Sequence, residues 1–283
     1  MKFSSKILLF GEYAVVLGRK GLAIPLDFYQ GEFSIVTKSD PQISAFLEYL
    51  KSSSLLSEVL NLELAEKEVQ QGLNFISNIP VGGGVGSSGA LCAAFYHRYG
   101  NIPYSELPFE RLLDHLSLME SFHHQSSSGI DPFVSLIDAP ISIEKRKNVI
   151  KQKLPQDLGF KVFVFNSKVK RKTAPLVAEF LSTYNENDRE LQEYFDRSDR
   201  CIDLVLNGLG SEAWNELVEI STHQYQKWNH LILADVKPLW LKGLQNQDFL
   251  LKICGAGGGG HYLMFAKERP QYFPYPLIEV SLV

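Results

Sequence analysis

The sequence of 283 residues predicts an α+β fold, and two observations carry this prediction. Strand-like alternation of apolar residues and helical spacing of apolar residues both occur, for example in Gly31–Thr37 and in Phe109–His124. The two kinds of segment do not alternate regularly, which argues against a parallel α/β sheet. Two glycine-rich loops, Pro80–Ala90 and Gly255–Gly260, interrupt the apolar segments and mark the places where backbone groups are most accessible.

In the first half of the chain, strands are expected at Lys6–Phe10, an apolar run bounded by Ser5 and Gly11, and at Gly31–Thr37. Helices are expected where apolar residues recur at helical spacing, namely at Ser44–Leu60, Leu62–Ile76, Ala90–Tyr99 and Phe109–His124. The third of these helices starts near two serines and stops at Gly100, which fits the usual helix signals.

The second half opens with a strand-like run, Phe160–Phe165. Helical spacing then predicts four helices, at Ala174–Ser182, Asn187–Gly208, Glu212–Trp228 and Pro238–Gly243. The remaining apolar runs are short and predict strands at Leu250–Cys254, Tyr262–Phe265 and Leu277–Val283. A polar, lysine-rich stretch at Glu144–Leu158 is the expected boundary between two domains, residues 1–150 and residues 151–283.

Composition excludes several classes of function. The net charge is −4 and no basic stripe is sustained, so nucleic acid is not expected as the main partner. The three cysteines are far apart and form no CxxC pair, which argues against disulfides and structural zinc and favours a reducing cytoplasm. No apolar run reaches 18 residues, so we expect no membrane span. The N-terminal apolar run Ile7–Phe10 is too short for the core of a signal peptide.

The first glycine loop contains Gly84–Gly89, which reads G-x-G-x-x-G. A dinucleotide fingerprint would need a strand directly before Gly84, but Pro80–Gly83 intervenes, and a Walker loop would need a lysine that is missing here. Glycine backbone next to a helix start remains a good cradle for phosphate, and the hydroxyls of Ser87 and Ser88 are hard ligands suited to Mg²⁺. The alternative is a glycine turn in which a serine simply caps the helix.

Two further segments carry side chains suited to phosphoryl transfer. Glu120 and His124 are four residues apart and share a helical face, and Asp131 follows a Ser-Ser-Ser-Gly turn that could bring a second carboxylate close. One carboxylate could then hold Mg²⁺ while the other accepts a proton from an attacking hydroxyl. The alternative is a solvated helix charge and a turn residue. The second glycine loop, within Lys252–Gly260, could form another wall of the same anion site.

Taken in order, these segments resemble the GHMP small-molecule kinases over nearly the whole chain. The three motifs are "KILLFGEYAVVLG" at Lys6–Gly18, "PVGGGVGSSGA" at Pro80–Ala90 and "KICGAGGGG" at Lys252–Gly260. The second is similar to P-x-x-x-G-L-G-S-S-A-A, with Val85 for leucine and Gly89 for alanine. Within the superfamily, "ESFHHQSSSGID" and "NSKVKRKTAPLV" are most similar to the mevalonate kinase branch, although the usual histidine after "GE" is Tyr13.

The resemblance implies a fold and a set of roles. The fold would join an N-terminal domain like ribosomal protein S5 to a C-terminal ferredoxin-like domain, with the ATP site between them. Asp131 would be the catalytic base and Lys6 would stabilise charge, while Glu120 and Ser88, with Ser87 as second choice, would hold Mg²⁺. The ATP phosphates would lie against Gly82, Gly83, Gly84, Gly86, Ser87, Ser88, Gly89, Gly255 and Gly257. The acceptor would lie near Glu12, Tyr13, His124, Arg171, Thr173, Gly255 and Ala256.

The implied reaction is ATP-dependent phosphorylation of a small hydroxylated molecule, with mevalonate or a similar hydroxy acid as the acceptor. Two alternatives stay open at this point. One is another GHMP kinase that acts on a sugar, homoserine or phosphomevalonate, and the other is a non-catalytic GHMP-like ligand sensor. The sequence also leaves open whether the chain is a monomer or a homodimer.

Overall fold

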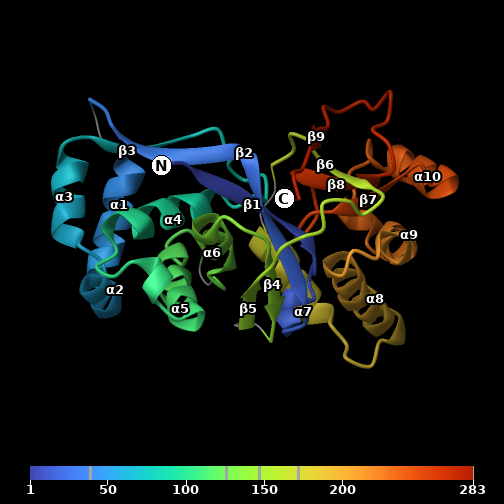
Figure 1. Ribbon diagram of the computed structural model, residues 1–283, viewed down its shortest axis with the longest axis horizontal. Coiled ribbons are helices and arrows are strands. Elements are labelled where there is room, and N and C mark those ends of the chain that lie inside the picture. Colours follow the sequence, from blue (N-terminus) through green and yellow to red (C-terminus); the bar gives the residue numbers. More distant parts are fainter. Residues whose placement is uncertain (38–39, 125–126, 146–147, 171–172, 283) are drawn as a thin grey trace. The chain divides into compact units, whose positions relative to one another are not determined.

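The computed structural model describes residues 1–37, 40–124, 127–145, 148–170 and 173–282 (Figure 1). Its contacts divide the chain into two compact units, each assembled from separate stretches of sequence. The first unit comprises Met1–Lys6, Pro25–Pro80 and Gly86–Ala139, and the second comprises Ile7–Ile24, Val81–Val85 and Pro140–Val283. Early segments therefore pack with the second unit, and our division into domains at residue 150 stays a prediction.

The first unit holds six helices among its described residues: α1 Pro41–Ser52, α2 Ser54–Val59, α3 Leu62–Gln70, α4 Ser87–Tyr99, α5 Phe109–Glu120 and α6 Ile130–Ile137. The far end of the long strand β2, Gly21–Ile35, pairs antiparallel with β3, Leu73–Ser77, in this unit. The core is formed by apolar side chains that the helices bury, among them Phe46, Leu50, Phe95, Leu116 and Phe133. α1, α4 and α5 bury apolar residues of the spacing that predicted them.

Local capping explains where the predicted helices of this unit were wrong. The expected helix Ser44–Leu60 is split at Ser53, whose extended backbone ends α1 and whose hydroxyl accepts a hydrogen bond from the Leu56 N–H. The expected helix Leu62–Ile76 ends early because Gly72 adopts a left-handed conformation, with φ of 98°. The residues that follow Gly72 form β3 instead.

The second unit contains a four-stranded antiparallel sheet in the order β7-β8-β6-β9. Its strands are β6 Lys161–Asn166, β7 Phe249–Ile253, β8 His261–Ala266 and β9 Ile278–Glu279. Helices α7 Thr173–Thr183, α8 Arg189–Leu206, α9 Gly210–Lys227 and α10 Lys237–Asn246 belong to the same unit. α8 packs against α9, and both α9 and α10 contact β7, as Figure 1 shows. The antiparallel sheets with segregated helices confirm the predicted α+β class.

Two short strands were not predicted and lie where we placed a domain boundary. β4, Ile141–Glu144, pairs antiparallel with β5, Asn148–Lys151, and also with the first residues of β2, Gly21–Ala23. β1, Phe3–Phe10, neighbours β2 in the same sheet. Within the described residues, the C-terminal strand β9 covers Ile278–Glu279 and is shorter than the expected Leu277–Val283.

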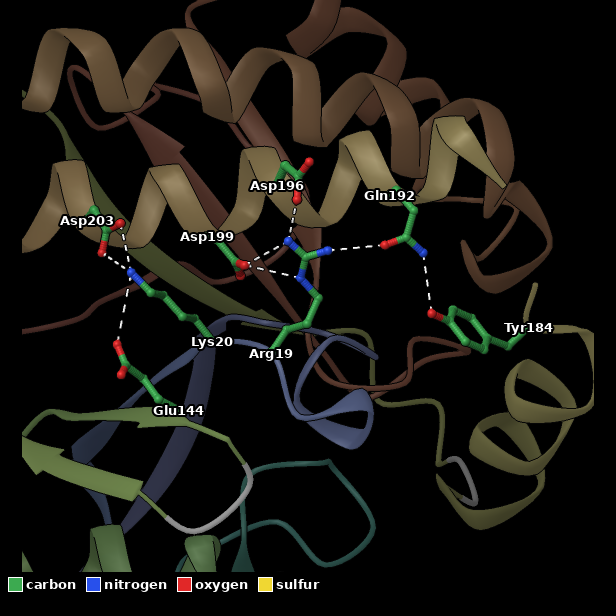
Figure 2. Close-up of polar contacts among 8 residues, drawn as sticks. All are labelled: Arg19, Lys20, Glu144, Tyr184, Gln192, Asp196, Asp199 and Asp203. Carbon is green, nitrogen blue, oxygen red and sulfur yellow. Dashed lines mark hydrogen bonds and ion pairs between the residues drawn. The ribbon is translucent and has the colours of Figure 1, made fainter. Parts of the chain in front are cut away.

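An ion-pair cluster anchors the turn between β1 and β2 on helix α8 of the second unit (Figure 2). Arg19 donates to Asp199 Oδ2 from Nε at 3.1 Å and from Nη2 at 2.9 Å, and it also pairs with Asp196. Lys20 Nζ lies 2.6 Å from Asp203 Oδ1. Burial raises the pKa of Asp199, and the guanidinium opposes that rise. The turn that carries the first motif is thus fixed by several contacts to one helix.

Candidate active site

Lys6 and Asp131 form an ion pair in the first unit, with 2.7 Å between Nζ and Oδ1. Lys6 lies on β1, and Asp131 lies in the first turn of α6, which starts after the left-handed Gly129. The positive end of the helix dipole favours a carboxylate at this position. The Lys6 side chain is 11% exposed and the Asp131 side chain 32%, so the carboxylate is open to a reactant. This is the geometry that a general base with an adjacent cation requires.

A second carboxylate, Glu120, lies at the end of α5 and is buried. Ser88 Oγ donates to Glu120 Oε1 at 3.4 Å, and Ser127 Oγ donates to Oε2. Burial, together with the nearby negative charge of Asp131, raises the pKa of Glu120 to about 8, while Ser127, Lys6 and Ser88 act in the opposite direction. With both carboxyl groups ionised, two negative charges would face one ammonium, and a bound cation would compensate the excess.

The residues at this point fit a magnesium ion. Glu120 and Ser88 offer a buried carboxylate and a hydroxyl at hydrogen-bond distance from each other. Within the described part of the chain, no group of three or more His, Cys, Asp or Glu side chains forms a metal cage. Mg²⁺ needs no such cage, because it usually binds through one or two protein oxygens, waters and substrate phosphates.

The glycine loop reaches α4 in a conformation that only glycine adopts freely. Gly82, Gly84 and Gly86 have φ of 76°, 76° and 75°. Gly86 is the N-cap of α4, and no side chain caps this helix. The alternative of a serine N-cap is therefore wrong, and Ser87 and Ser88 are the first two helical residues. An uncapped helix start after a glycine loop suits an anion.

Two glycines of this loop pack closely against the Lys6–Asp131 pair. A Cβ on Gly86 would lie 3.2 Å from Lys6 Cγ and 3.4 Å from Asp131 Oδ2. A Cβ on Gly89 would lie only 2.8 Å from the Asp131 carbonyl carbon. Gly89, expected to contact phosphate, is buried in α4 and allows the backbone of α6 to approach. The role of Gly89 visible here is packing.

His124 also lies in this cluster, with Nε2 at 3.3 Å from Ser88 Oγ. The first unit therefore brings together the predicted side chains Lys6, Ser88, Glu120, His124 and Asp131. Ser127 was missed by sequence reasoning, because three consecutive serines give no signal for which of them turns toward Glu120.

Gly86, Ser87 and Gly89 also belong to the first unit, and the other predicted residues that the structure describes lie in the second unit. Gly83 accepts a hydrogen bond from His261 Nδ1 at 2.8 Å, which ties the start of the second motif to the end of the third. Gly255 and Gly257 have φ of 60° and 67° and form the turn that contains the buried Ala256. Thr173 is the exposed first residue of α7. Arg171 lies outside the described residues.

Glu12 and Tyr13, expected near the acceptor, are buried in the second unit. The Glu12 carboxylate pairs with Lys252, and the Tyr13 hydroxyl donates to the Ala256 carbonyl at 2.8 Å. Lys252 and His261 were not predicted as site residues. Both stand at the ends of the glycine run "KICGAGGGGH", and their partners lie far away in sequence, so no local spacing could identify them.

Residues 50–138 match the family model described as GHMP kinases N terminal domain. A protein of Archaeoglobus fulgidus named mevalonate kinase is 29% identical over 283 residues, which cover 94% of this chain and 92% of that protein. The solved structure of Methanococcus jannaschii mevalonate kinase has a TM-score of 0.64 at 18% identity, with 100% and 98% of the two chains covered. Streptococcus pneumoniae phosphomevalonate kinase, in complex with phosphomevalonate and AMPPNP, has a TM-score of 0.66 at 13% identity, with 95% and 92% covered.

These likenesses show that the chain has the GHMP kinase fold, as the sequence motifs implied. Within the described residues, no helix is long and apolar enough to span a membrane.

Proposed function

We propose that the chain is a GHMP kinase that phosphorylates mevalonate with ATP, because residues 50–138 match the GHMP kinases N terminal domain. The curated relatives support this acceptor, because they share the name mevalonate kinase and align along 94% of the chain. The observation that carries the chemistry is the ion pair between Lys6 and Asp131, beside the buried Glu120. We further propose that the chain acts in the cytoplasm.

In the proposed reaction, the acceptor hydroxyl attacks the γ-phosphorus of ATP, and the bond from this phosphorus to the β–γ bridging oxygen breaks. Asp131 takes the proton of the hydroxyl, and Lys6, at 2.7 Å from Asp131 Oδ1, stabilises the negative charge that develops on the attacking oxygen. The backbone of Gly84–Ser88, where α4 begins, holds the phosphates. Phosphoryl transfer needs mainly this positioning and charge compensation, and no covalent enzyme intermediate.

Glu120 and Ser88 would hold Mg²⁺, which supplies charge neutralisation to the phosphates when bound. His124 and Ser127 keep these two side chains in place, through contacts with Ser88 Oγ and with Glu120 Oε2. Residues that orient metal ligands in this way commonly affect metal affinity.

A second acceptor deserves testing because Tyr13 stands where the mevalonate kinase pattern has histidine. The competing hypothesis is a related kinase for phosphomevalonate, homoserine or a sugar. An ADP-release assay with the full chain, Mg·ATP and each acceptor in turn separates these substrates. We expect the highest kcat/KM with mevalonate, and turnover of another acceptor with none of mevalonate would overturn the assignment. Light scattering of the same sample separates monomer from homodimer.

The mechanism is tested with Asp131→Asn and Lys6→Met. Removal of a general base typically costs about 10²- to 10⁴-fold in rate, so we expect losses of that size with nucleotide binding retained. Asp138→Asn is a matched control, because Asp138 is exposed at the other end of the same helix. A variant at Asp131 with a rate within about threefold of that of the unmodified chain would exclude the proposed base.

A further inference from the structure

The turn of the first motif and the third glycine motif are joined inside the second unit at two points. The turn follows β1 and contains Glu12 and Tyr13, and the third motif runs from Lys252 to Gly260. Each contact links a side chain of the turn to a residue of the third motif. Both contacts are buried, so neither residue of the turn presents its polar atoms to solvent.

The first contact is the ion pair of Glu12 with Lys252. Each side chain is 1% exposed. Lys252 Nζ also donates to the carbonyl of Ile253 at 3.2 Å and lies 5.7 Å from the centre of the Phe10 ring. Removing one partner of a buried ion pair leaves the other charge uncompensated, which makes the pair mutually dependent. The Glu12 carboxylate therefore binds Lys252 and not a small molecule.

The second contact is made by Tyr13, which is 5% exposed and has φ of 60°. A left-handed backbone is strained for a residue as bulky as tyrosine. Such strain persists only where the surrounding structure holds the residue in place. Its hydroxyl donates to the Ala256 carbonyl at 2.8 Å. Its ring packs on Phe180, with 4.3 Å between ring centres, and on the edge of Trp228.

Both joined segments are anchored independently on helices of the same unit. Arg19 and Lys20 fix the turn on α8, as Figure 2 shows. On the other side, Gln224 of α9 accepts a hydrogen bond from the Ile253 N–H at 2.9 Å, and the Gly258 N–H donates to the Leu231 carbonyl at 2.8 Å. The glycine turn at residues 255–257 is therefore held between fixed elements.

We propose that Glu12 and Tyr13 are positioning residues that hold the turn of Gly255–Gly257 in shape, and that their polar groups do not contact the acceptor. The expected effect on turnover rests on the proposed function, whereas the effect on stability and nucleotide binding does not. Because Tyr13 stands in place of the usual histidine, its hydroxyl contact with Ala256 is a feature of this chain's own sequence.

The test compares Glu12→Gln, Lys252→Met, their double variant and Tyr13→Phe, with Glu279→Gln as a control in an exposed pair, 3.8 Å from Lys161. Each variant is measured for Tm, for the Kd of a non-hydrolysable Mg·ATP analogue, and for kcat and acceptor KM well below its Tm. We expect each single change in the buried pair to lower Tm by roughly 6 to 10 °C, and the double variant to lose less than the sum.

For the folded variants we expect at least a threefold loss in analogue affinity or in kcat, with the acceptor KM within about twofold of its original value. Tyr13→Phe tests the positioning role even if the Glu12 variants fail to fold, because this substitution removes only the hydroxyl oxygen and keeps the ring. A rise of tenfold or more in acceptor KM, with Tm and analogue Kd unchanged, would make these residues substrate contacts and overturn the proposal. Unchanged values of all four quantities would overturn it as well. Absence of turnover in the original chain would instead reject the proposed function, and Tm and analogue Kd would still decide the positioning role.

Discussion

Gly89→Ala offers a sharp test of how closely α4 and α6 must approach to place Asp131. The added Cβ would lie 2.8 Å from the Asp131 carbonyl carbon and 2.9 Å from both Asp131 Cβ and Pro132 N. Two of these three atoms belong to the backbone, so the overlap with the added Cβ is removed only if helix α6 moves. Rotation of a side chain is not enough. Ordinary contact begins near 3.4 Å, so a shift of about half an ångström at Asp131 follows.

The magnitude follows from two opposing effects. Overpacking of a core costs about 1–3 kcal/mol, and alanine in a helix recovers about 0.5–1 kcal/mol relative to glycine. A net loss of about 1–2 kcal/mol corresponds to a fall in Tm of roughly 2–8 °C. Misplacement of a catalytic group by about 1 Å can cost a factor of about 100, so we expect kcat to fall roughly tenfold.

Thermal unfolding and the ADP-release assay measure both effects. In an Asp131→Asn background, Gly89→Ala should add little further loss of kcat, because both changes act on the same group. Gly89→Ala with the original Tm and kcat would refute the reasoning, even though alanine is the residue that similar loops of the family carry at this place.

Two further predictions concern charge. The pKa of Glu120 is raised to about 8. Between roughly pH 5 and pH 8, the Glu120 carboxyl therefore keeps its proton in the folded chain but has released it in the unfolded chain. The metal-free protein should lose stability as the pH rises through this range. Unfolding measured across that range should show a flatter pH dependence for Glu120→Gln, and equal slopes would contradict the assignment. Arg19→Ala removes two hydrogen bonds to Asp199 and should cost about 1–2 kcal/mol in urea unfolding, an estimate that an unchanged midpoint would reject.

Much of the site could be predicted because its residues lie in short, recognisable segments. The spacing of Glu120 and Asp131 around a turn, and the serines after the glycine loop, were enough to nominate side chains that the structure places together. Lys6 lies at hydrogen-bond distance from Asp131, although 124 residues separate them along the chain. That pairing came from the family resemblance and not from local spacing.

The parts that escaped prediction lack a periodic signal. Helix α6 reads IDPFVSLI, and its eight residues are too few for a periodic pattern to mark it as a helix. β3 follows α3 closely, and only Gln71 and the left-handed Gly72 lie between them. The pairing of Glu12 with Lys252 joins distant segments and depends on tertiary structure alone.

The two carboxylates of the site lie in contrasting environments, which supports different roles for them. Asp131 lies at the N-terminal end of α6, where the helix dipole favours negative charge, and Lys6 adds a full positive charge at 2.7 Å. Glu120 is the last residue of α5, where the dipole disfavours a carboxylate, and it is buried as well. Burial and the nearby charge of Asp131 raise the pKa of Glu120, and a divalent cation would oppose this rise. Because Asp131 is the more exposed and better compensated of the two, it is the one suited to meet a hydroxyl group, and Glu120 is suited to hold a metal ion.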